Sequence, residues 1–258
     1  MTTKHQQDGH LNVLVNKIDA ELSTTPTDVV VLPELTTLDY ARATFEELDT
    51  LAEPLDGRSF QKWSGLAQKH DCHIVYDFAR QEAGRNFIST AVVSPGGKLI
   101  GFYDKLHLCH YGAGIEKDYF TIGDHIFSFA VNGIKLAPII CYDIRIPELC
   151  RTLTLSHNDD VILHCGAYFR DESFATWHSF AKTRAMENQI YLLSLNRAGE
   201  YYGNSLFCPP WMDEKTPPTQ FPAHEEMLKH ITIDGQTIAD TRKNYTFLSD
   251  RHKDYTAL

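Results

Sequence analysis

The chain has 258 residues, of which 43% are hydrophobic and 22% charged. This ordinary globular balance excludes a disordered or fibrous protein. The 34 acidic residues outnumber the 24 lysines and arginines, which gives a net charge of -10. An acidic chain lacks the basic surface with which proteins normally bind nucleic acid or anionic membranes, so we expect neither partner.

The sequence predicts a cytoplasmic protein. No apolar run approaches the roughly 20 residues that span a bilayer. Residues 1–10 are polar and contain no apolar core of a secretory signal. Six cysteines spread over so long a chain are typical of reduced thiols rather than of a disulfide framework.

Short β-branched runs along the chain predict strands, because they are bounded by Pro, Gly, Asp or Asn and are too short for helices. They cover residues 28–32, 73–76, 90–93, 98–103, 135–140, 160–163 and 190–195. Apolar residues at helical spacing predict helices over 11–22, 60–67 and 174–184, the last capped by Asp171. The region 86–140 offers strands and turns but no clear helix. This mixture favours an α/β fold in which helices cover sheets.

The domain organisation is expected to be simple. No repeat, low-complexity tract or linker divides the chain, so residues 1–258 are predicted to form a single domain. The stretch 208–258 is rich in Pro, Asp and Lys and is predicted to be an irregular C-terminal excursion.

Three ionisable residues lie just past the ends of predicted strands. Glu34 follows DVVVLP, Lys105 follows LIGFYD and Cys141 follows KLAPII. Binding sites in open α/β sheets collect outside the carboxyl ends of strands, so we expect the three to converge. Each also has a simpler interpretation: a solvated turn carboxylate, a surface lysine paired with Asp104, and a small buried core residue.

The residues around these positions carry a family resemblance. VVLPE around Glu34, YDKLHL around Lys105 and CYDIRIPE around Cys141 resemble the signatures of the nitrilase, or carbon–nitrogen hydrolase, superfamily. GIEKDYFTIGD resembles the segment in which that family carries a second, supporting glutamate, here Glu116. TRAMENQIYLLSLNRAG and GNSLF are similar to its later helix, strand and loop, so the likeness extends from about Asn12 to the region of Asp250.

The resemblance implies a four-layer α-β-β-α sandwich that assembles as a homodimer or larger homo-oligomer. One feature departs from the family. Its members usually open with a hydrophobic strand that ends in glutamine, whereas this chain opens with MTTKHQQDGHLN. Gln6 or Gln7 and Asn12 are the candidate equivalents, and the apolar strand is missing. Either the chain is shortened at its start, or this edge of the sheet is frayed.

The residue types suit cysteine-dependent hydrolysis. A free cysteine has a pKa of about 8.5 and needs a neighbouring base to become a nucleophile at neutral pH. Glu34 fits the general base. Lys105, with the backbone N–H of Tyr142, fits the group that faces the oxyanion of a tetrahedral intermediate. Glu116 would hold Lys105 or Glu34 in place, its alternative being a solvated loop acid. No metal or organic cofactor is required.

Other candidates carry weaker signals. His107-Leu108-Cys109-His110 and His164-Cys165 suggest a metal, but they lack the ligand spacing of zinc sites. His107 is instead expected to line the pocket or brace its strand. Arg145 could bind a substrate carboxylate or could form a salt bridge with Asp143, Glu148 or Glu187. Further pocket candidates, by their nearness to the motif ends, are Tyr40, Tyr142, Ala167 and Tyr168.

We therefore predict a hydrolase of a non-peptide carbon–nitrogen bond, most simply a small primary amide. CYDIRIPE resembles the amidase branches that act on ω-amides of dicarboxylates or on deaminated glutathione. Nitrilases tend to carry Trp-Glu after the cysteine, where this chain has Tyr142 and Asp143. The alternatives are an N-carbamoyl hydrolase or a nitrilase and, outside the class, a non-catalytic binding protein.

Overall fold

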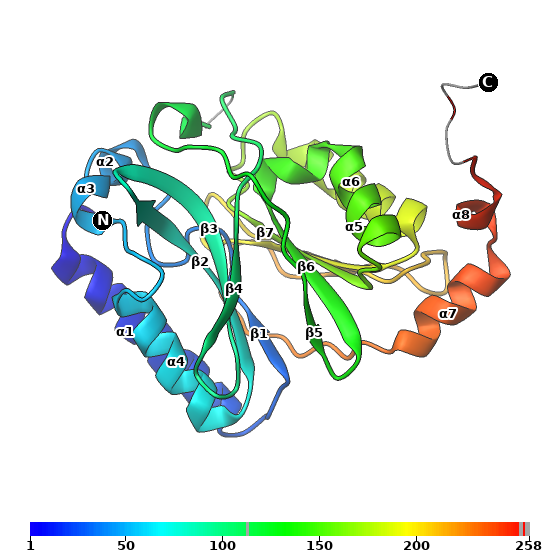
Figure 1. Cartoon of the computed structure of the whole chain (residues 1–258), viewed down its shortest axis with the longest axis horizontal. Helices are drawn as coiled ribbons and strands as arrows, with labels where there is room; N and C mark the ends of the chain where they lie inside the picture. The colour runs from blue at the N-terminus through cyan, green and yellow to red at the C-terminus, as the bar shows by residue number, and fades with distance from the viewer. Residues whose placement is uncertain (112–113, 253–254, 256–258) are drawn as a thin grey trace.

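Two sheets pack face to face in the computed structural model, which describes residues 1–111, 114–252 and 255 (Figure 1). The first sheet has the order β1-β2-β3-β4. Its strands are β1 (Val29–Val31), β2 (His73–Glu82), β3 (Arg85–Val93) and β4 (Leu99–Asp104). β1 and β2 are parallel, and the other two pairs are antiparallel. β4 therefore runs in the same direction as β1.

The second sheet has the order β10-β9-β8-β7-β6-β5. Its strands are β5 (Phe129–Val131), β6 (Ile134–Ile140), β7 (Val161–Gly166), β8 (Tyr191–Asn196), β9 (Leu206–Cys208) and β10 (Thr219–Gln220). β6, β7 and β8 are parallel, and the remaining neighbours are antiparallel.

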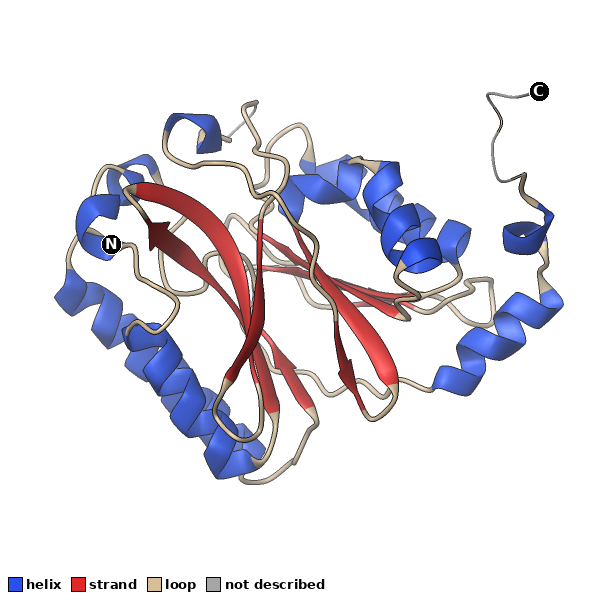
Figure 2. Cartoon of the chain, viewed as in Figure 1, coloured by secondary structure: helices blue, strands red, loops and turns tan. Residues whose placement is uncertain are grey.

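Helices cover the outer faces of both sheets (Figure 2). α1 (Lys4–Leu22) and α4 (Arg58–His70) lie on the first sheet, and α5 (Pro147–Ser156) and α6 (Phe174–Asn188) on the second. The remaining elements are α2 (Arg42–Phe45), α3 (Leu48–Leu51), η1 (Glu116–Asp118), η2 (Cys141–Arg145), α7 (Gly235–Asn244) and α8 (Phe247–Asp250). The layers follow the order α-β-β-α, which confirms the expected fold class.

The alternation of side chains along β2 shows how the layers are held together. Ile74 and Tyr76 belong to the core beneath α1 and α4, whereas Val75 belongs to the core between the two sheets. Successive residues of a strand point to opposite faces, so a strand buried on both faces needs a nearly continuous apolar run. Within the described residues, none of the helices combines the length and apolar character that crossing a bilayer requires.

β2 and β3 are more than twice as long as the sequence predicts. β2 continues through Asp77 and Arg80 to Glu82, although both polar side chains are buried. Thr90 donates a 2.6 Å hydrogen bond to Asp77, and the guanidinium of Arg80 pairs with Asp104 at 2.6 Å. Because each polar side chain finds a partner on another strand of the sheet, β3 for Asp77 and β4 for Arg80, the apolar pattern alone underestimates the strand.

The start of α6 also differs from the expectation. Ser173 is the N-cap residue, and Asp171 lies two positions earlier, where it accepts the backbone N–H of Ser173 at 2.8 Å. The prediction of Asp171 as the cap is wrong, because its carboxylate supports the turn before the helix rather than the first helical turn.

The two ends of the chain contain more helix than expected. α1 begins at Lys4 with Thr3 as its cap, no strand precedes it within the described residues, and β1 is the edge of its sheet. In the stretch expected to be irregular, α7 spans ten residues and is capped by Asp234, which accepts the N–H of Gln236 at 2.9 Å.

Candidate active site

Glu34, Lys105 and Cys141 lie together at one end of the sandwich. Lys105 directly follows β4, Cys141 directly follows β6, and Glu34 comes after Leu32 and Pro33 at the end of β1. The N–H of Leu32 still donates to Val75 at 2.9 Å, but Pro33 has no N–H, so the chain leaves the sheet there. The expected convergence is therefore observed, with residues from both sheets.

Lys105 bridges two carboxylates. Its Nζ lies 2.7 Å from Oε1 of Glu34 and 2.6 Å from Oε1 of Glu116, and all three residues are fully buried. Glu116 also accepts the hydroxyl of Tyr40 at 2.8 Å and the backbone N–H of Cys109 at 2.8 Å. Four contacts thus fix Lys105 and Glu116, and the simpler interpretation of Glu116 as a solvated acid does not hold.

Cys141 occupies a strained turn. Its φ is 44°, a region that costs a non-glycine residue about 1–2 kcal/mol. Its carbonyl oxygen is held at 2.9 Å by Nε2 of His164 and at 2.9 Å by the hydroxyl of Tyr168. These two anchors hold the backbone in place, so that the side chain is presented at the end of β6.

Asp143 connects this turn to the strand that carries Lys105. One carboxylate oxygen accepts the N–H of Ile140 at 3.0 Å and the hydroxyl of Tyr103 at 2.7 Å. The other accepts the backbone N–H of His107 at 2.9 Å and lies 2.7 Å from its Nδ1. A fully buried carboxylate with four partners is a rigid clamp between the two loops.

Burial and charge set the protonation states. Burial raises the pKa of Glu34 to about 7, against the opposing charge of Lys105. Burial alone would lower the pKa of Lys105, but the charges of Glu116 and Glu34 raise it well above its ordinary value. Burial, reinforced by the charge of Glu34, raises the pKa of the Cys141 thiol well above its ordinary value. Near neutral pH the site therefore holds a cationic lysine and a protonated thiol.

A small cavity of about 40 Å³ opens onto Cys141. Five of the predicted pocket residues line it, namely Tyr40, Tyr142, Arg145, Ala167 and Tyr168. The residues that sequence reasoning missed are Cys109, Tyr111, Gly114, Phe169, Asp171 and Ser173. Phe169, Asp171 and Ser173 directly follow the predicted Ala167 and Tyr168, so an extension of that loop would have found them.

The sequence left two roles open for His107 and two for Arg145, and the structure answers the two cases differently. His107 is not among the residues that line the cavity and is bound to Asp143, which is the bracing alternative. The guanidinium of Arg145 lies 5.5 Å from the ring centre of Tyr111 and 5.0 Å from that of Phe180. In the described part of the chain no ion pair joins it to Asp143, Glu148 or Glu187, and Glu187 pairs with Arg184 instead.

Arg197 is a second residue that the sequence did not single out. Its Nη1 donates to the backbone carbonyls of Glu34, Leu35 and Leu38 at 3.1, 2.8 and 2.8 Å. Leu35 has a φ of 47°, so this loop is strained in the same sense as the Cys141 turn. The only sequence indication was that Arg197 lies in the segment NRAG, which contributes to the family resemblance but suggests no role for this residue.

The possible metal ligands are engaged elsewhere. Nδ1 of His164 lies 2.7 Å from the hydroxyl of Ser194, and burial lowers the pKa of this histidine to about 4. The Sγ of Cys109 lies 3.7 Å from the backbone carbonyl oxygen of Tyr111. Over the described ranges, no group of three or more His, Cys, Asp and Glu side chains is arranged to hold a metal ion.

Comparison with known proteins agrees with this arrangement. The sequence profile described as carbon-nitrogen hydrolase matches residues 3–243. A 2-oxoglutaramate amidase of Bacillus subtilis (strain 168) is 32% identical, over 88% of this chain and 86% of the amidase.

Solved structures show the same fold. A CN-hydrolase superfamily protein of Xanthomonas campestris, with an arsenic adduct in its active site, has a TM-score of 0.83 at 22% identity over 98% of this chain and 94% of that one. An amidase of Nesterenkonia sp., with acrylamide added to its active-site cysteine, has a TM-score of 0.72 at 19% identity over 94% of each chain. With its profile, its relatives and its four layers in agreement, the protein belongs to the carbon–nitrogen hydrolase family of the nitrilase superfamily.

Proposed function

We propose that the protein hydrolyses a small primary amide to an acid and ammonia, through a thioester on Cys141. The observation that carries this proposal is the buried set of Glu34, Lys105 and Glu116 beside a strained cysteine that lines a cavity. A merely structural ion pair would not need a base whose pKa burial has raised to about 7, close to the optimum for proton transfer at neutral pH.

The first half of the reaction forms the thioester. The sulfur of Cys141 attacks the amide carbon while Glu34 takes the thiol proton. The tetrahedral intermediate then collapses, its C–N bond breaks, and Glu34 returns the proton to the nitrogen, which leaves as ammonia. Because the thiol is protonated in the resting state, the base must act during the attack rather than before it.

The second half releases the acid. Water attacks the thioester carbon while Glu34 takes one of its protons, and the C–S bond breaks as the sulfur recovers a proton. In both halves the negative charge on oxygen would face Lys105 and the N–H of Tyr142. Lys105 stays cationic because its two carboxylates raise its pKa, and losing such a donor typically costs about 100- to 1000-fold in rate.

The substrate is proposed to carry a second, ionised carboxylate. Arg145 lines the cavity, and its guanidinium packs on aromatic rings without a carboxylate partner among the described residues. An arginine held in this way can bind a substrate carboxylate by donating two hydrogen bonds to it. The name of the Bacillus relative, an amidase for a dicarboxylate monoamide, points the same way.

We further propose that the enzyme works in the cytoplasm as a homodimer or larger homo-oligomer. All six cysteines are unpaired, which suits a reducing compartment. The oligomer rests on the family resemblance alone.

Ammonia release across matched substrates tests the proposal. Succinamate, the nitrile of the same acid, neutral butanamide and an N-carbamoyl amino acid should be compared at equal concentration. The specificity constant for succinamate is expected to exceed that of its nitrile by at least about 100-fold. Equal or better turnover of the nitrile or of the carbamoyl compound would assign the site to one of those two activities. Absence of turnover on every substrate would favour a binding protein.

The role of Arg145 is tested in the same assay. Arg145→Met keeps the apolar stem but removes the guanidinium, so it should raise KM for succinamate by at least about tenfold, the cost of a lost hydrogen bond to a charged group. Butanamide provides the control, since its KM should change little. An equal rise in KM for both amides would indicate that Arg145 has a structural role instead.

A further inference from the structure

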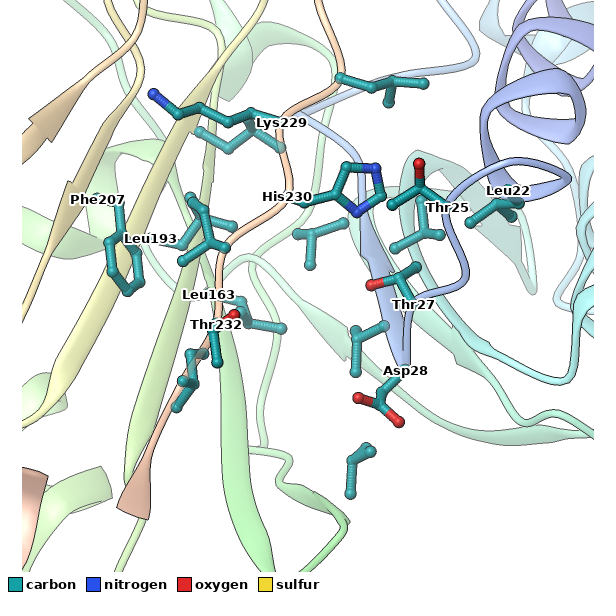
Figure 3. A pocket seen from close by; sticks show the side chains of 18 of the residues that line it. Leu22, Thr25, Thr27, Asp28, Leu163, Leu193, Phe207, Lys229, His230 and Thr232 are labelled. Atoms are coloured by element: carbon teal, nitrogen blue, oxygen red, sulfur yellow. The ribbon is translucent and has the colours of Figure 1, made fainter. Parts of the chain in front are cut away.

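A second and much larger cavity lies away from Cys141. It has a volume of about 590 Å³, within the range of about 300–1,000 Å³ that is usual for ligand pockets. It is bordered by β1 on one side and by residues 227–233 on the other, and we call it the edge cavity (Figure 3). None of the residues that line the small catalytic cavity lines this one.

One wall of the edge cavity is a strand with a free edge. The carbonyl of Asp28 accepts the N–H of His73 at 2.8 Å, and the N–H of Leu32 donates to Val75 at 2.9 Å, so both positions face β2. Backbone groups alternate in direction along a strand. The N–H and C=O groups of Val29 and Val31 therefore point away from β2, into the edge cavity.

The opposite wall, residues 227–233, is an extended stretch that is not part of a β-sheet. Within the described part of the chain, no backbone hydrogen bond joins residues 227–233 to another segment. The two walls thus present unpaired backbone groups across the cavity. An amphiphile could fill the apolar volume, whereas an extended polypeptide could also pair with those groups, because its donors and acceptors repeat at the same spacing.

The other two surfaces are aliphatic. Leu163 of β7 and Leu193 of β8 are register partners and form the floor, while Ile18 and Leu22, one turn apart on α1, lie on the other side. A strand buried on both faces is nearly continuously apolar, so an occupant of this space should carry uncharged aliphatic side chains.

Charged side chains available to an occupant lie only at the two ends of the edge cavity. Asp28 and Lys229 lie at opposite ends of the edge cavity (Figure 3). Glu21, also at the rim, already pairs with His230 at 3.0 Å. An occupant should therefore be neutral in its middle, with a cation beside Asp28 and an anion beside Lys229.

We propose that the edge cavity binds an extended aliphatic segment of another polypeptide, flanked by opposite charges, as an additional strand beside β1. Main-chain hydrogen bonds to Val29 and Val31 would set its register, and the leucine floor would select its side chains. This site is independent of the proposed amidase activity.

A labelled peptide tests the proposal with the full chain. Its core is six alternating valines and isoleucines, with two lysines before them and two glutamates after them. Fluorescence anisotropy should show saturable one-to-one binding. A peptide of the same sequence with N-methylated core amides keeps its apolar surface but cannot donate hydrogen bonds, so it should bind at least about tenfold more weakly.

Two variants locate the binding site. Leu193→Lys places a charge on the cavity floor and should weaken peptide binding by at least about tenfold. Val13→Lys is the matched control, because Val13 is 61% exposed on α1 and does not line the cavity. If Leu193→Lys does not fold, the comparison of the two peptides decides alone.

The alternatives have distinct outcomes. Equal binding of the N-methylated peptide, or saturable binding of dodecanoate with no binding of the peptide, would overturn the strand proposal and assign the cavity to apolar ligands. Peptide binding that Leu193→Lys leaves unchanged in a folded variant would place the interaction elsewhere and refute the site. No binding of any of these probes would also refute it.

Discussion

Glu34 combines two properties that rarely occur in one carboxylate. It is fully buried, and it touches a lysine at 2.7 Å. Burial disfavours its ionised form, the lysine favours it, and the balance leaves its pKa at about 7. A base with this pKa is ionised often enough to accept a proton at neutral pH and is basic enough to hold it.

This balance predicts the acid limb of the pH profile. Glu34 accepts a proton only when it is ionised, so kcat/KM should fall as the pH drops through about 7. Titration of turnover between about pH 5 and 9 measures it. His107→Asn is the control, because His107 is bound to Asp143 close to the Cys141 turn and takes no part in the proposed proton transfer. A limb that disappears in His107→Asn would contradict the assignment to Glu34.

Glu34→Gln should remove the base and keep the shape. Turnover of the preferred amide is expected to fall by at least about 100-fold, the usual contribution of general acid–base catalysis. Circular dichroism should show a folded protein, since the glutamine oxygen can still accept from Lys105. Near-normal turnover would exclude Glu34 from the mechanism.

Substitution of Cys141 should affect turnover far more than substitution of the buried core cysteines. Cys141→Ala is expected to fold and to be inactive, and mass spectrometry should place an electrophilic adduct on Cys141. Cys150 and Cys165 are buried in the core, so Cys150→Ala and Cys165→Ala should keep turnover. An adduct on another cysteine would show that the nucleophile is wrongly assigned.

At the scale of elements, the turn η2 depends on its anchors. Asp143 joins the turn to Tyr103 and His107, so it positions Cys141 relative to Lys105 without touching a substrate. Asp143→Asn replaces one carboxylate oxygen, which accepts two hydrogen bonds, by an amide NH2 that can only donate. It should lower kcat by at least about tenfold while KM changes little.

Tyr103→Phe is the matched control for Asp143. It removes one donor and leaves three partners of the carboxylate in place, so kcat should fall less than in Asp143→Asn. Steady-state kinetics of the two variants give the comparison. A rise in KM without a change in kcat would indicate that Asp143 shapes binding instead.

The helices and strands also show how much of the structure could be predicted from the sequence. Apolar runs located seven strands, and the motifs around Glu34, Lys105 and Cys141 indicated the candidate site, because strand ends and their following residues are local features. β2 was underestimated because its polar residues Asp77 and Arg80 are buried and pair with residues on other strands. Arg197 escaped notice because its three carbonyl acceptors lie about 160 residues away in the chain.

At the scale of the whole molecule, the two sheets share one site. Glu34 and Lys105 come from the first sheet and Cys141 from the second, so the packing of the sheets fixes the distance between the proposed base and the proposed nucleophile. The fold could be predicted only through the family resemblance. Pattern alone indicates sheets covered by helices, but it does not say that two sheets pack together.

The assembly remains a prediction at this scale. Light scattering at micromolar concentration should give at least twice the chain mass of 29.4 kDa. A mass near that of one chain would contradict the expected homo-oligomer. The free edge of β1 makes this measurement informative, because an unpaired edge is a common place for chains to associate.

The protonated state of Cys141 has a consequence for oxidative damage. Peroxides attack the thiolate, and a low pKa with open access is what makes a cysteine a redox sensor. Cys141 has neither, since burial and Glu34 raise its pKa and only 9% of the residue is exposed. We therefore expect Cys141 to react slowly with peroxide when no substrate is bound, which mass spectrometry of the peroxide-treated protein would measure.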